Sequence, residues 1–434
     1  MRRVVIGCVL SMIWFIPTVF FAAAENAEGT AAGKKTHVRR LTHSVALAMW
    51  DFSWLVRCHA GGGFENIDQA LDELCERGYN AVRIDVFPHL LALPGRNLPD
   101  QITFKGSAHK HVLWGNDVDV TVRPLDALVH FLQACRERHV YVEFSTWYYG
   151  NLPEMTVETI PEVQGFEGFV RSWEETIAYL EQRNLMDNIL FIDLLNEYPR
   201  WHFFRWLNQN ADTAMIAVGQ ENHIQTNQKF AIHPNTKVFY KDFSTRALAR
   251  LRQRFPQYDF CFGYTVGWDA GRIESYLPLA ELDVVDGHIW FSNFLKTLDM
   301  RNPFGMSIPA RQQRQAEILL VWTQQKSQLI QKMRESIERI AAWGAVAGVP
   351  IGNTEGWGSV EWDDVEGLNW DFIKQSAEAA IPIALEKNFS FICTSNFTHP
   401  HFRRLWRDVA WHQAITAQIR SHQLPAKPSI VSGQ

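Results

Sequence analysis

Short apolar runs alternate with longer amphipathic segments along most of the chain, beginning at Ser44. The short runs are rich in β-branched and aromatic residues, a composition typical of buried parallel strands. We predict a strand in each of eight runs, at residues 45–54, 80–87, 140–147, 189–196, 260–266, 284–290, 350–354 and 389–395.

The segments between these runs repeat apolar residues at three- and four-residue intervals, which predicts helices with one buried face. The clearest are residues 66–77, 124–138, 167–183, 244–255, 325–343 and 369–386. Eight strand–helix units predict an α/β fold, a closed TIM barrel of eight parallel strands. An open doubly wound sheet is the alternative, but no Gly-x-Gly-x-x-Gly motif opens a helix after the first strand. We expect a single barrel domain over residues 41–425 and a short tail over 426–434.

The N-terminus has the pattern of an export signal. Met1, Arg2 and Arg3 give a positive start, residues 4–21 are almost wholly apolar, and three alanines precede Glu25. We predict a signal peptide over residues 1–24, a solvated linker over 25–40 and a secreted or periplasmic protein. A membrane anchor is the alternative, since the apolar run is near the minimum spanning length. After signal cleavage no second apolar run predicts a membrane span.

Composition narrows the class of protein. Of the 434 residues 47% are hydrophobic and 21% are charged, which argues against a disordered chain. The net charge of −5 and the lack of a basic stripe argue against nucleic-acid binding. The five cysteines beyond the signal have no metal-like spacing, and buried thiols are favoured over a disulfide framework.

Surplus length points to one face of the barrel. The span from Ser44 to Arg420 far exceeds the roughly 250 residues of a typical barrel. Long connections follow the second, fourth and sixth predicted strands, over residues 88–122, 198–239 and 291–322. All three leave the carboxyl ends of strands, where barrel active sites are built.

Two glutamates stand at matching places on this face. Glu197 follows Asn196 at the end of the fourth strand, and Glu355 follows the seventh strand before Gly356-Trp357-Gly358. A lone strand-end glutamate is usually a salt-bridge partner or a cap. Two carboxylates facing each other across a barrel mouth are the groups that glycoside hydrolysis requires.

With these motifs the chain resembles the clan A glycoside hydrolases, in particular the cellulase-like barrels of family 5. The matched places are Gly78–Ile84 with Arg83, Asn196-Glu197, His288-Ile289-Trp290 and Glu355. The resemblance implies that Glu197 is the acid/base and Glu355 the nucleophile of a retaining enzyme that needs neither a cofactor nor a metal. It implies that Arg83 orients the nucleophile and that Asn196 contacts the sugar 2-hydroxyl. Retention requires carboxyl groups about 5–5.5 Å apart.

The chain also departs from the family pattern. A Tyr that contacts the nucleophile usually follows the strand-six His, but Trp290 stands nearest that position. Tyr198 or Tyr264 is a candidate substitute. The eighth strand lacks the usual terminal Trp, and Phe397 or a loop Trp is the candidate platform.

The remaining candidates for substrate contact are aromatic or polar residues near strand ends. A sugar presents C–H faces that pack on aromatic rings, while polar groups bind its hydroxyls. We expect Trp54, Trp147, Trp290 and Trp357 to lie around one sugar-sized pocket, and His288 and Asn396 to bind the substrate as well. His399 and His401 form an H-x-H pair without the further ligands of a metal site.

Three functions are compatible with these patterns. A secreted retaining hydrolase of a β-linked glycan is favoured by the two glutamates. A sugar-binding protein on the same scaffold without turnover is favoured by the departures on strands six and eight. A metal-dependent hydrolase would need converging His and Asp ligands that the sequence does not supply.

Overall fold

The computed structural model describes residues 33–106, 118–148, 164–199, 207, 234–266, 273–291, 306–358, 364, 367 and 369–426. The predicted signal peptide, nearly all of the tail, and large parts of the three long connections lie outside the described residues. Within the described ranges, no helix is both long enough and apolar enough to cross a membrane.

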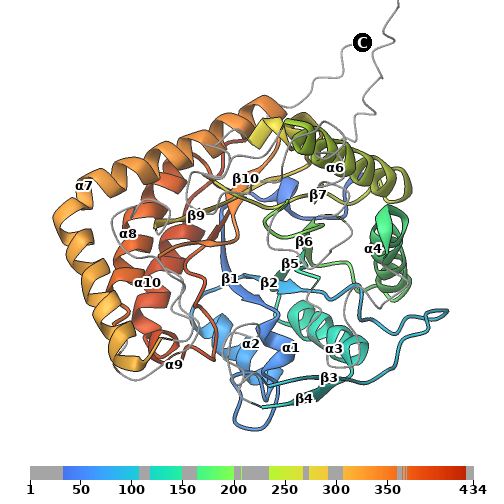
Figure 1. The fold of residues 1–434 in the computed structure, drawn as a ribbon, viewed down its shortest axis with the longest axis horizontal. Helices are drawn as coiled ribbons and strands as arrows, with labels where there is room; N and C mark the ends of the chain where they lie inside the picture. The colour runs from blue at the N-terminus through green and yellow to red at the C-terminus, as the bar shows by residue number, and fades with distance from the viewer. Residues whose placement is uncertain are drawn as a thin grey trace, which may run out of the picture.

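Parallel strands form a closed barrel at the centre of the molecule (Figure 1). They are β1 (Val45–Asp51), β2 (Ala81–Asp85), β5 (Tyr141–Ser145), β6 (Ile189–Asp193), β7 (Phe260–Cys261), β8 (Tyr264–Thr265), β9 (Val285–Trp290), β10 (Ile351–Asn353) and β12 (Phe391–Cys393). Each of the eight predicted runs contains one strand of the barrel. In the fifth run, this strand is broken into two pieces, β7 and β8. Because β7 pairs with β6 while β8 pairs with β9, this split strand closes the ring. The predicted eight-stranded TIM barrel is confirmed.

Helices surround the barrel and cover its outer surface (Figure 1). The long ones are α2 (Ile67–Glu76), α3 (Pro124–Glu137), α4 (Gly165–Gln182), α6 (Pro234–Arg254), α7 (Ile308–Ala347), α8 (Asp371–Glu386) and α10 (Val409–Arg420). Short turns of helix are α1 (Ser53–Val56), α9 (Arg403–Trp406), η2 (Val38–Arg40), η6 (Ile273–Ser275) and η7 (Leu279–Glu281). In α3 the buried Leu128, Phe131, Leu132 and Cys135 recur at three- and four-residue steps, as the periodicity predicted.

Three departures from the predicted elements have local causes. The first strand ends at Asp51, because Phe52 begins the turn into α1. Helix α7 starts at Ile308, where Ser307 caps it by accepting a hydrogen bond from the Ala310 amide, and it is kinked at Gln325, the residue where the predicted helix begins. The long connection after β2 contains an antiparallel hairpin, β3 (Ile102–Phe104) and β4 (Val120–Val122).

Residues 33–40 pack against the amino-terminal ends of β6 and β7. Thr36 is fully buried and donates a hydrogen bond to Asp259 at 2.5 Å, and the His37 amide donates to the Ile189 carbonyl at 3.1 Å. Val38 is buried as well. The predicted solvated linker over 25–40 is therefore wrong for residues 33–40, because this stretch carries partners for a buried carboxylate.

The barrel interior changes from apolar to polar toward the carboxyl ends of the strands. Phe191 and Phe391 are fully buried and their rings lie 4.7 Å apart. Further along β2 and β5, Arg83 and Glu143 are register partners. Pleating points alternate side chains to one face, so these two share the interior with Ser145. The polar layer places ionisable groups beneath the mouth of the barrel.

Candidate active site

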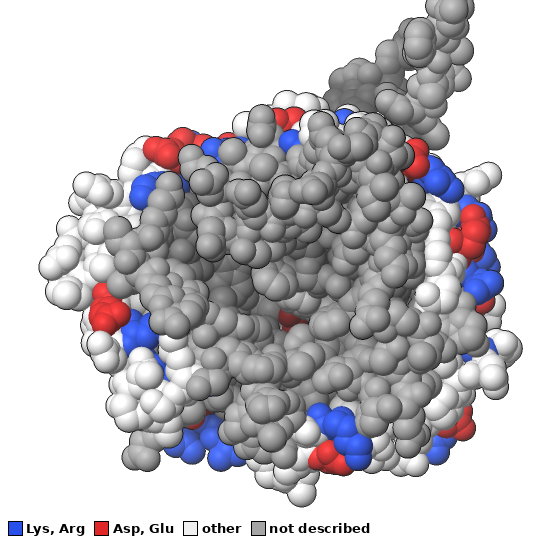
Figure 2. All heavy atoms as spheres, in the orientation of Figure 1, with Lys and Arg blue, Asp and Glu red and all other residues white. Residues whose placement is uncertain are grey.

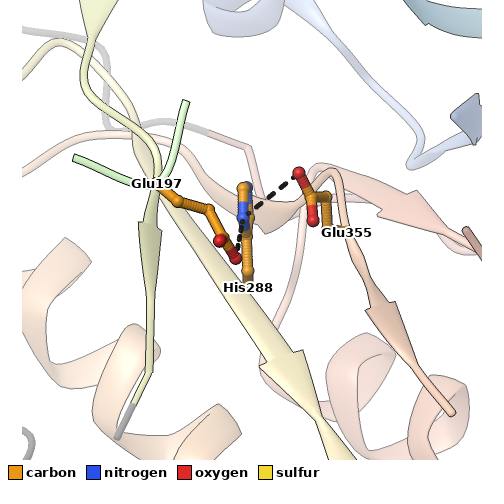
Figure 3. Close-up of side chains that lie close together, drawn as sticks. All are labelled: Glu197, His288 and Glu355. Atoms are coloured by element: carbon orange, nitrogen blue, oxygen red, sulfur yellow. Dashed lines mark hydrogen bonds and ion pairs between the residues drawn. The ribbon is translucent and has the colours of Figure 1, made fainter. Parts of the chain in front are cut away.

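Glu197 and Glu355 lie together at the carboxyl ends of the strands, with His288 between them (Figure 3). The Nδ1 atom of His288 lies 3.2 Å from Glu197 Oε1 and 3.5 Å from Glu355 Oε1. The contacting atoms of all three side chains lie within 4.8 Å of one another. Glu197 is 5% exposed and Glu355 is 2% exposed, so each keeps a small opening to solvent. In Figure 2, acidic atoms are visible at the centre of the displayed face. The tertiary structure thus joins two carboxyls that are far apart in sequence.

The backbone at each glutamate is fixed by neighbouring strands. Glu197 has a φ of +46°, and the next amide, of Tyr198, donates to the Gly263 carbonyl at 2.8 Å. Glu355 sits in the turn between β10 and β11 (Gly356–Trp357), where β11 pairs with β9. A Cβ on Gly356 would lie 3.0 Å from the Ile289 carbonyl oxygen, so a side chain would crowd this pairing. A residue with positive φ at such a site commonly marks a functional constraint.

Arg83 reaches Glu355 from β2. Its Nη1 donates to Glu355 Oε1 at 2.8 Å and to the Thr354 hydroxyl at 2.9 Å. Its Nη2 donates to the Ser145 hydroxyl at 3.0 Å and to Asn196 Oδ1. The guanidinium is fully buried, and this fork fixes one oxygen of Glu355.

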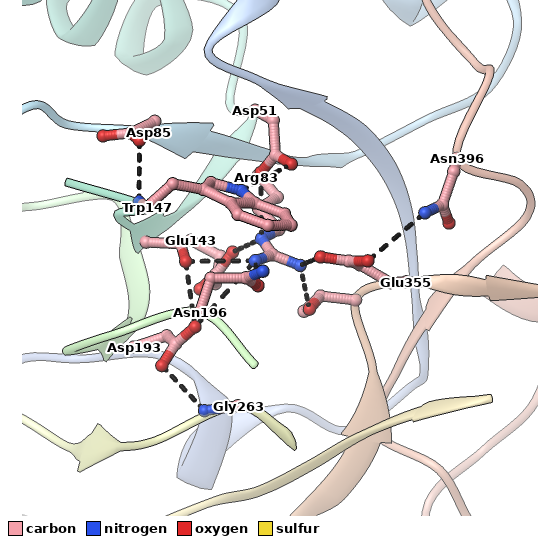
Figure 4. A network of polar contacts seen from close by, with 12 residues as sticks. Asp51, Arg83, Asp85, Glu143, Trp147, Asp193, Asn196, Gly263, Glu355 and Asn396 are labelled. Carbon is pink, nitrogen blue, oxygen red and sulfur yellow. Dashed lines mark hydrogen bonds and ion pairs between the residues drawn. The ribbon is translucent and has the colours of Figure 1, made fainter. Parts of the chain in front are cut away.

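Further buried carboxylates surround Arg83 (Figure 4). Arg83 Nε lies 3.4 Å from Asp51 Oδ1 and 3.3 Å from Glu143 Oε2, and Nη2 lies 3.9 Å from Asp193 Oδ2. The sequence reasoning missed all three as site residues. Glu143 was detectable, because it lies two residues before the end of its strand and pairs in register with Arg83. Asp51 was not, because its position depends on where β1 ends.

The protonation of the site follows from burial and from this surplus of acids. Burial raises the pKa of Glu355 to about 8; His288 and Arg83 act against the rise, and Glu197 adds to it. Burial alone would lower the pKa of His288, but Glu355 and Asp286 outweigh it and hold that pKa well above its usual range. With a pKa of about 8, Glu355 holds its proton at neutral pH and loses it as the pH rises through this value.

His288 is held from its far side by Asp286, which comes from the same strand. Its Nε2 lies 3.5 Å from Asp286 Oδ2 and 3.2 Å from the Thr354 hydroxyl. That hydroxyl donates to Asp286 at 2.6 Å. A carboxylate behind an imidazole fixes the orientation of the ring.

Neither tyrosine proposed as a substitute reaches the nucleophile position. The Tyr198 hydroxyl donates to the Tyr240 carbonyl on α6 at 2.6 Å, outside the barrel. The ring of Tyr264 packs against Trp343 of α7, with centroids 5.4 Å apart. Among the described residues, the contact to Glu355 that the family pattern gives to a Tyr is made by His288, Arg83 and Asn396.

The four predicted tryptophans do not line one pocket. Trp147 is partly exposed, and its indole N–H donates to Asp51 Oδ2 at 2.9 Å. Trp290, at the end of β9, is 8% exposed. Trp357 is fully buried and donates to the Cys393 carbonyl at 2.8 Å. Trp54 donates to the Asp85 carbonyl, and its ring packs against Phe131 of α3. The predicted contact of substrate with Trp54 and Trp357 is therefore wrong, because hydrogen bonds and packing direct both rings into the protein.

Asn396 and Phe397 have structural partners at the end of β12. Asn396 accepts a hydrogen bond from the Gly356 amide at 2.6 Å, and its Nδ2 donates to Glu355 Oε2 at 3.4 Å. Asn396 thus positions the nucleophile candidate. Phe397 is fully buried between Trp370 and Phe402, with ring centroids 5.5 and 4.9 Å away, so it does not supply the platform.

The same three side chains also have the ligand types of a metal site. Glu197, His288 and Glu355 each offer one ligand atom within the 4.8 Å span. The Glu355 oxygen nearest His288 already accepts from Arg83, whose positive charge opposes a cation there. In the described part of the chain, His399 and His401 belong to no such group. Their rings instead pack on Phe402.

Comparisons with known proteins identify the family of the chain. The model of the sugar-binding cellulase-like family matches residues 47–420. The chain belongs to this family. It is similar to a protein from Parabacteroides distasonis ATCC 8503 described as a "putative glycoside hydrolase", with 27% identity and a TM-score of 0.72, covering 89% of this chain and 96% of that one. The cellulase-like resemblance inferred from sequence is confirmed.

Two other similar structures have lower identities and lower TM-scores. An exo-β-1,4-mannosidase from Opitutaceae bacterium strain TAV5 is 13% identical, with a TM-score of 0.46, covering 88% of this chain and 61% of that one. An endoglucanase is 12% identical, with a TM-score of 0.44, covering 87% of this chain and 99% of that one. A comparison with curated proteins found no match.

Proposed function

We propose that this family member is a secreted retaining β-glycoside hydrolase, with Glu197 as the acid/base and Glu355 as the nucleophile. The observation that carries the proposal is the pair of carboxyls on either side of His288, with contacting atoms within 4.8 Å. Carboxyl oxygens this close to each other support a retaining mechanism, because inverting enzymes place their carboxyls about 6.5–9.5 Å apart to admit a water molecule.

The hydrogen bonds support a division of roles between the two carboxyls. Glu355 receives N–H groups from Arg83 and Asn396, which can only donate, so they favour an ionised acceptor. Glu197 contacts the Thr265 hydroxyl and His288 Nδ1 instead. The role of the acid that begins the reaction is therefore assigned to Glu197, and Glu355 attacks once it has lost its own proton.

The reaction then proceeds by two displacements. Glu355 attacks the anomeric carbon while the bond to the leaving oxygen breaks and Glu197 gives that oxygen its proton. Water next attacks the glycosyl–Glu355 ester, Glu197 takes a proton from this water, and the Glu355 carboxylate leaves. Asn196 Nδ2 is buried and has no hydrogen-bond partner, so a sugar hydroxyl would satisfy it.

The test measures hydrolysis of aryl β-glycosides and of β-glucan, mannan and xylan. Glu197→Gln and Glu355→Ala are each expected to lower kcat by at least about 100-fold, the usual size of such a contribution. Glu335→Gln on the exposed side of α7 is the matched control and should leave kcat unchanged. Azide should restore turnover to Glu355→Ala, with inverted product. Full activity in either site variant would refute the assignment.

A sugar-binding protein without turnover is the alternative outcome. In that case the unmodified protein binds one of the glycans but hydrolyses none of the substrates. Secretion is a separate proposal that rests on residues 1–24. N-terminal sequencing of exported protein is expected to begin at Glu25.

A further inference from the structure

Trp147 is the aromatic side chain of the predicted set that stays partly exposed beside the catalytic pair. Its backbone amide donates to Asp85 Oδ2 at 2.8 Å, and its indole N–H donates to Asp51 Oδ2 at 2.9 Å. Phe52 meets its ring edge to face, with centroids 6.4 Å apart. The side chain is thus held by two carboxylates, one at its backbone amide and one at its indole N–H (Figure 4).

Asp51 occupies an unusual backbone position. The register of β1 against β2 shifts between Met49 and Asp51, and Asp51 has a φ of +42°. Bulges of this kind redirect a side chain and concentrate near active sites. The redirected carboxylate is 2% exposed and meets Trp147 through one oxygen.

The second oxygen of Asp51 has a different neighbour. Oδ1 accepts no hydrogen bond, although Arg83 Nε lies 3.4 Å away. Arg83 in turn donates to Glu355. One buried carboxylate therefore contacts both the exposed aromatic ring and the guanidinium that holds the nucleophile. A carboxylate buried with so few hydrogen bonds costs stability, which favours a functional reason for its presence.

We propose that Asp51 is a positioning residue that fixes the Trp147 ring as the surface against which one sugar ring of the substrate packs. The inference deepens the proposed function and rests on it for the identity of the ligand as a β-linked sugar. A rigid aromatic face lowers the entropy cost of binding, because the ring is already in place before the sugar arrives. Asp51 itself transfers no proton in this assignment.

The test is a double-mutant cycle on sugar binding. Cellotriose, mannotriose and xylotriose are titrated by calorimetry into protein carrying Glu197→Gln, so that the probe is not consumed. In this background Trp147→Phe keeps an aromatic ring but removes the indole N–H, and Asp51→Ala removes its acceptor. Each is expected to weaken the Kd about 2- to 10-fold, the value of one hydrogen bond. Trp147→Ala is expected to weaken it by at least about tenfold, because the ring itself is lost.

The coupling between the two positions decides the outcome. If Asp51 acts through Trp147, the double variant Asp51→Ala/Trp147→Phe binds sugar as tightly as Asp51→Ala alone, within about twofold. If the fold-change in Kd of the double variant equals the product of the two single fold-changes, the proposal is overturned. Unchanged binding by Trp147→Ala would also overturn it, as would the absence of binding of all three sugars to the parent protein. Thermal unfolding of each variant confirms that it is folded.

A matched pair elsewhere on the molecule controls for loss of an indole–carboxylate bond. Trp411 on α10 donates its indole N–H to Glu378 Oε1 at 3.0 Å on the exposed surface. Trp411→Phe and Glu378→Ala should leave the Kd unchanged. Sugar binding with the predicted coupling, but no turnover by the unmodified protein, would refute the hydrolase and leave the positioning role standing.

Discussion

Replacing Glu355 by Gln is expected to stabilise the protein increasingly as the pH rises. Burial raises the pKa of Glu355 from 4.5 to about 8 in the folded state. Between these values the folded protein holds a proton that the unfolded chain has lost, so stability falls as the pH rises through this window. Gln cannot ionise, and the variant escapes this loss. The nucleophile candidate would thus reduce stability at neutral and alkaline pH.

The size of the effect follows from linkage. From pH 5 to pH 8 the wild type loses about 1.4 kcal/mol for each pH unit, or roughly 4 kcal/mol in all. We expect the free energy of unfolding of Glu355→Gln, relative to wild type, to rise by about 2–4 kcal/mol over this range.

Urea denaturation at pH 5 and at pH 8 measures both proteins under matched conditions. Glu335→Gln makes the same chemical change on an exposed surface and should track the wild type at both pH values. A constant difference between Glu355→Gln and wild type across the two conditions would refute the reasoning. The buried carboxyl would then not hold a proton in this range.

Three further predictions concern the proton, the guanidinium and the N-terminal segment. The value of kcat/KM should rise as the pH rises through about 8, because Glu355 must lose its proton before it can attack; a fall over that range would contradict the assigned role. Arg83→Lys keeps the charge but not the fork, so kcat/KM should fall by about 10- to 100-fold in a protein that remains folded by circular dichroism. Equal activity would show that the fork is dispensable. Thr36→Val removes the hydrogen bond to the buried Asp259 and should lower the free energy of unfolding by about 1–3 kcal/mol in urea titrations, with kcat unchanged. Unchanged stability would mean that residues 33–40 contribute little to the fold.

Much of the barrel could be predicted from the sequence. Each strand and helix buries one face, and the apolar residues of that face recur at a regular spacing along the chain. The strands at residues 45–51 and 189–193 lie inside their predicted runs. The first half of α7 was missed, since its long polar stretch buries few apolar side chains, among them Ile318 and Trp322. Its start depends on a cap and on contact with the barrel.

The sequence by itself determined which strands end in glutamates, and therefore that Glu197 and Glu355 would emerge on one face. In a parallel barrel, alternate side chains of a strand point to the same face, and all strands end at the same rim, so both features follow from the local sequence. Only the tertiary structure decided which side chains meet there. It placed His288 between the glutamates, directed Trp54 into the helical shell, and brought Asp51 to Trp147. The physical reason is that a contact across the barrel depends on bulges, strand ends and competing hydrogen bonds, none of which has a period along the chain.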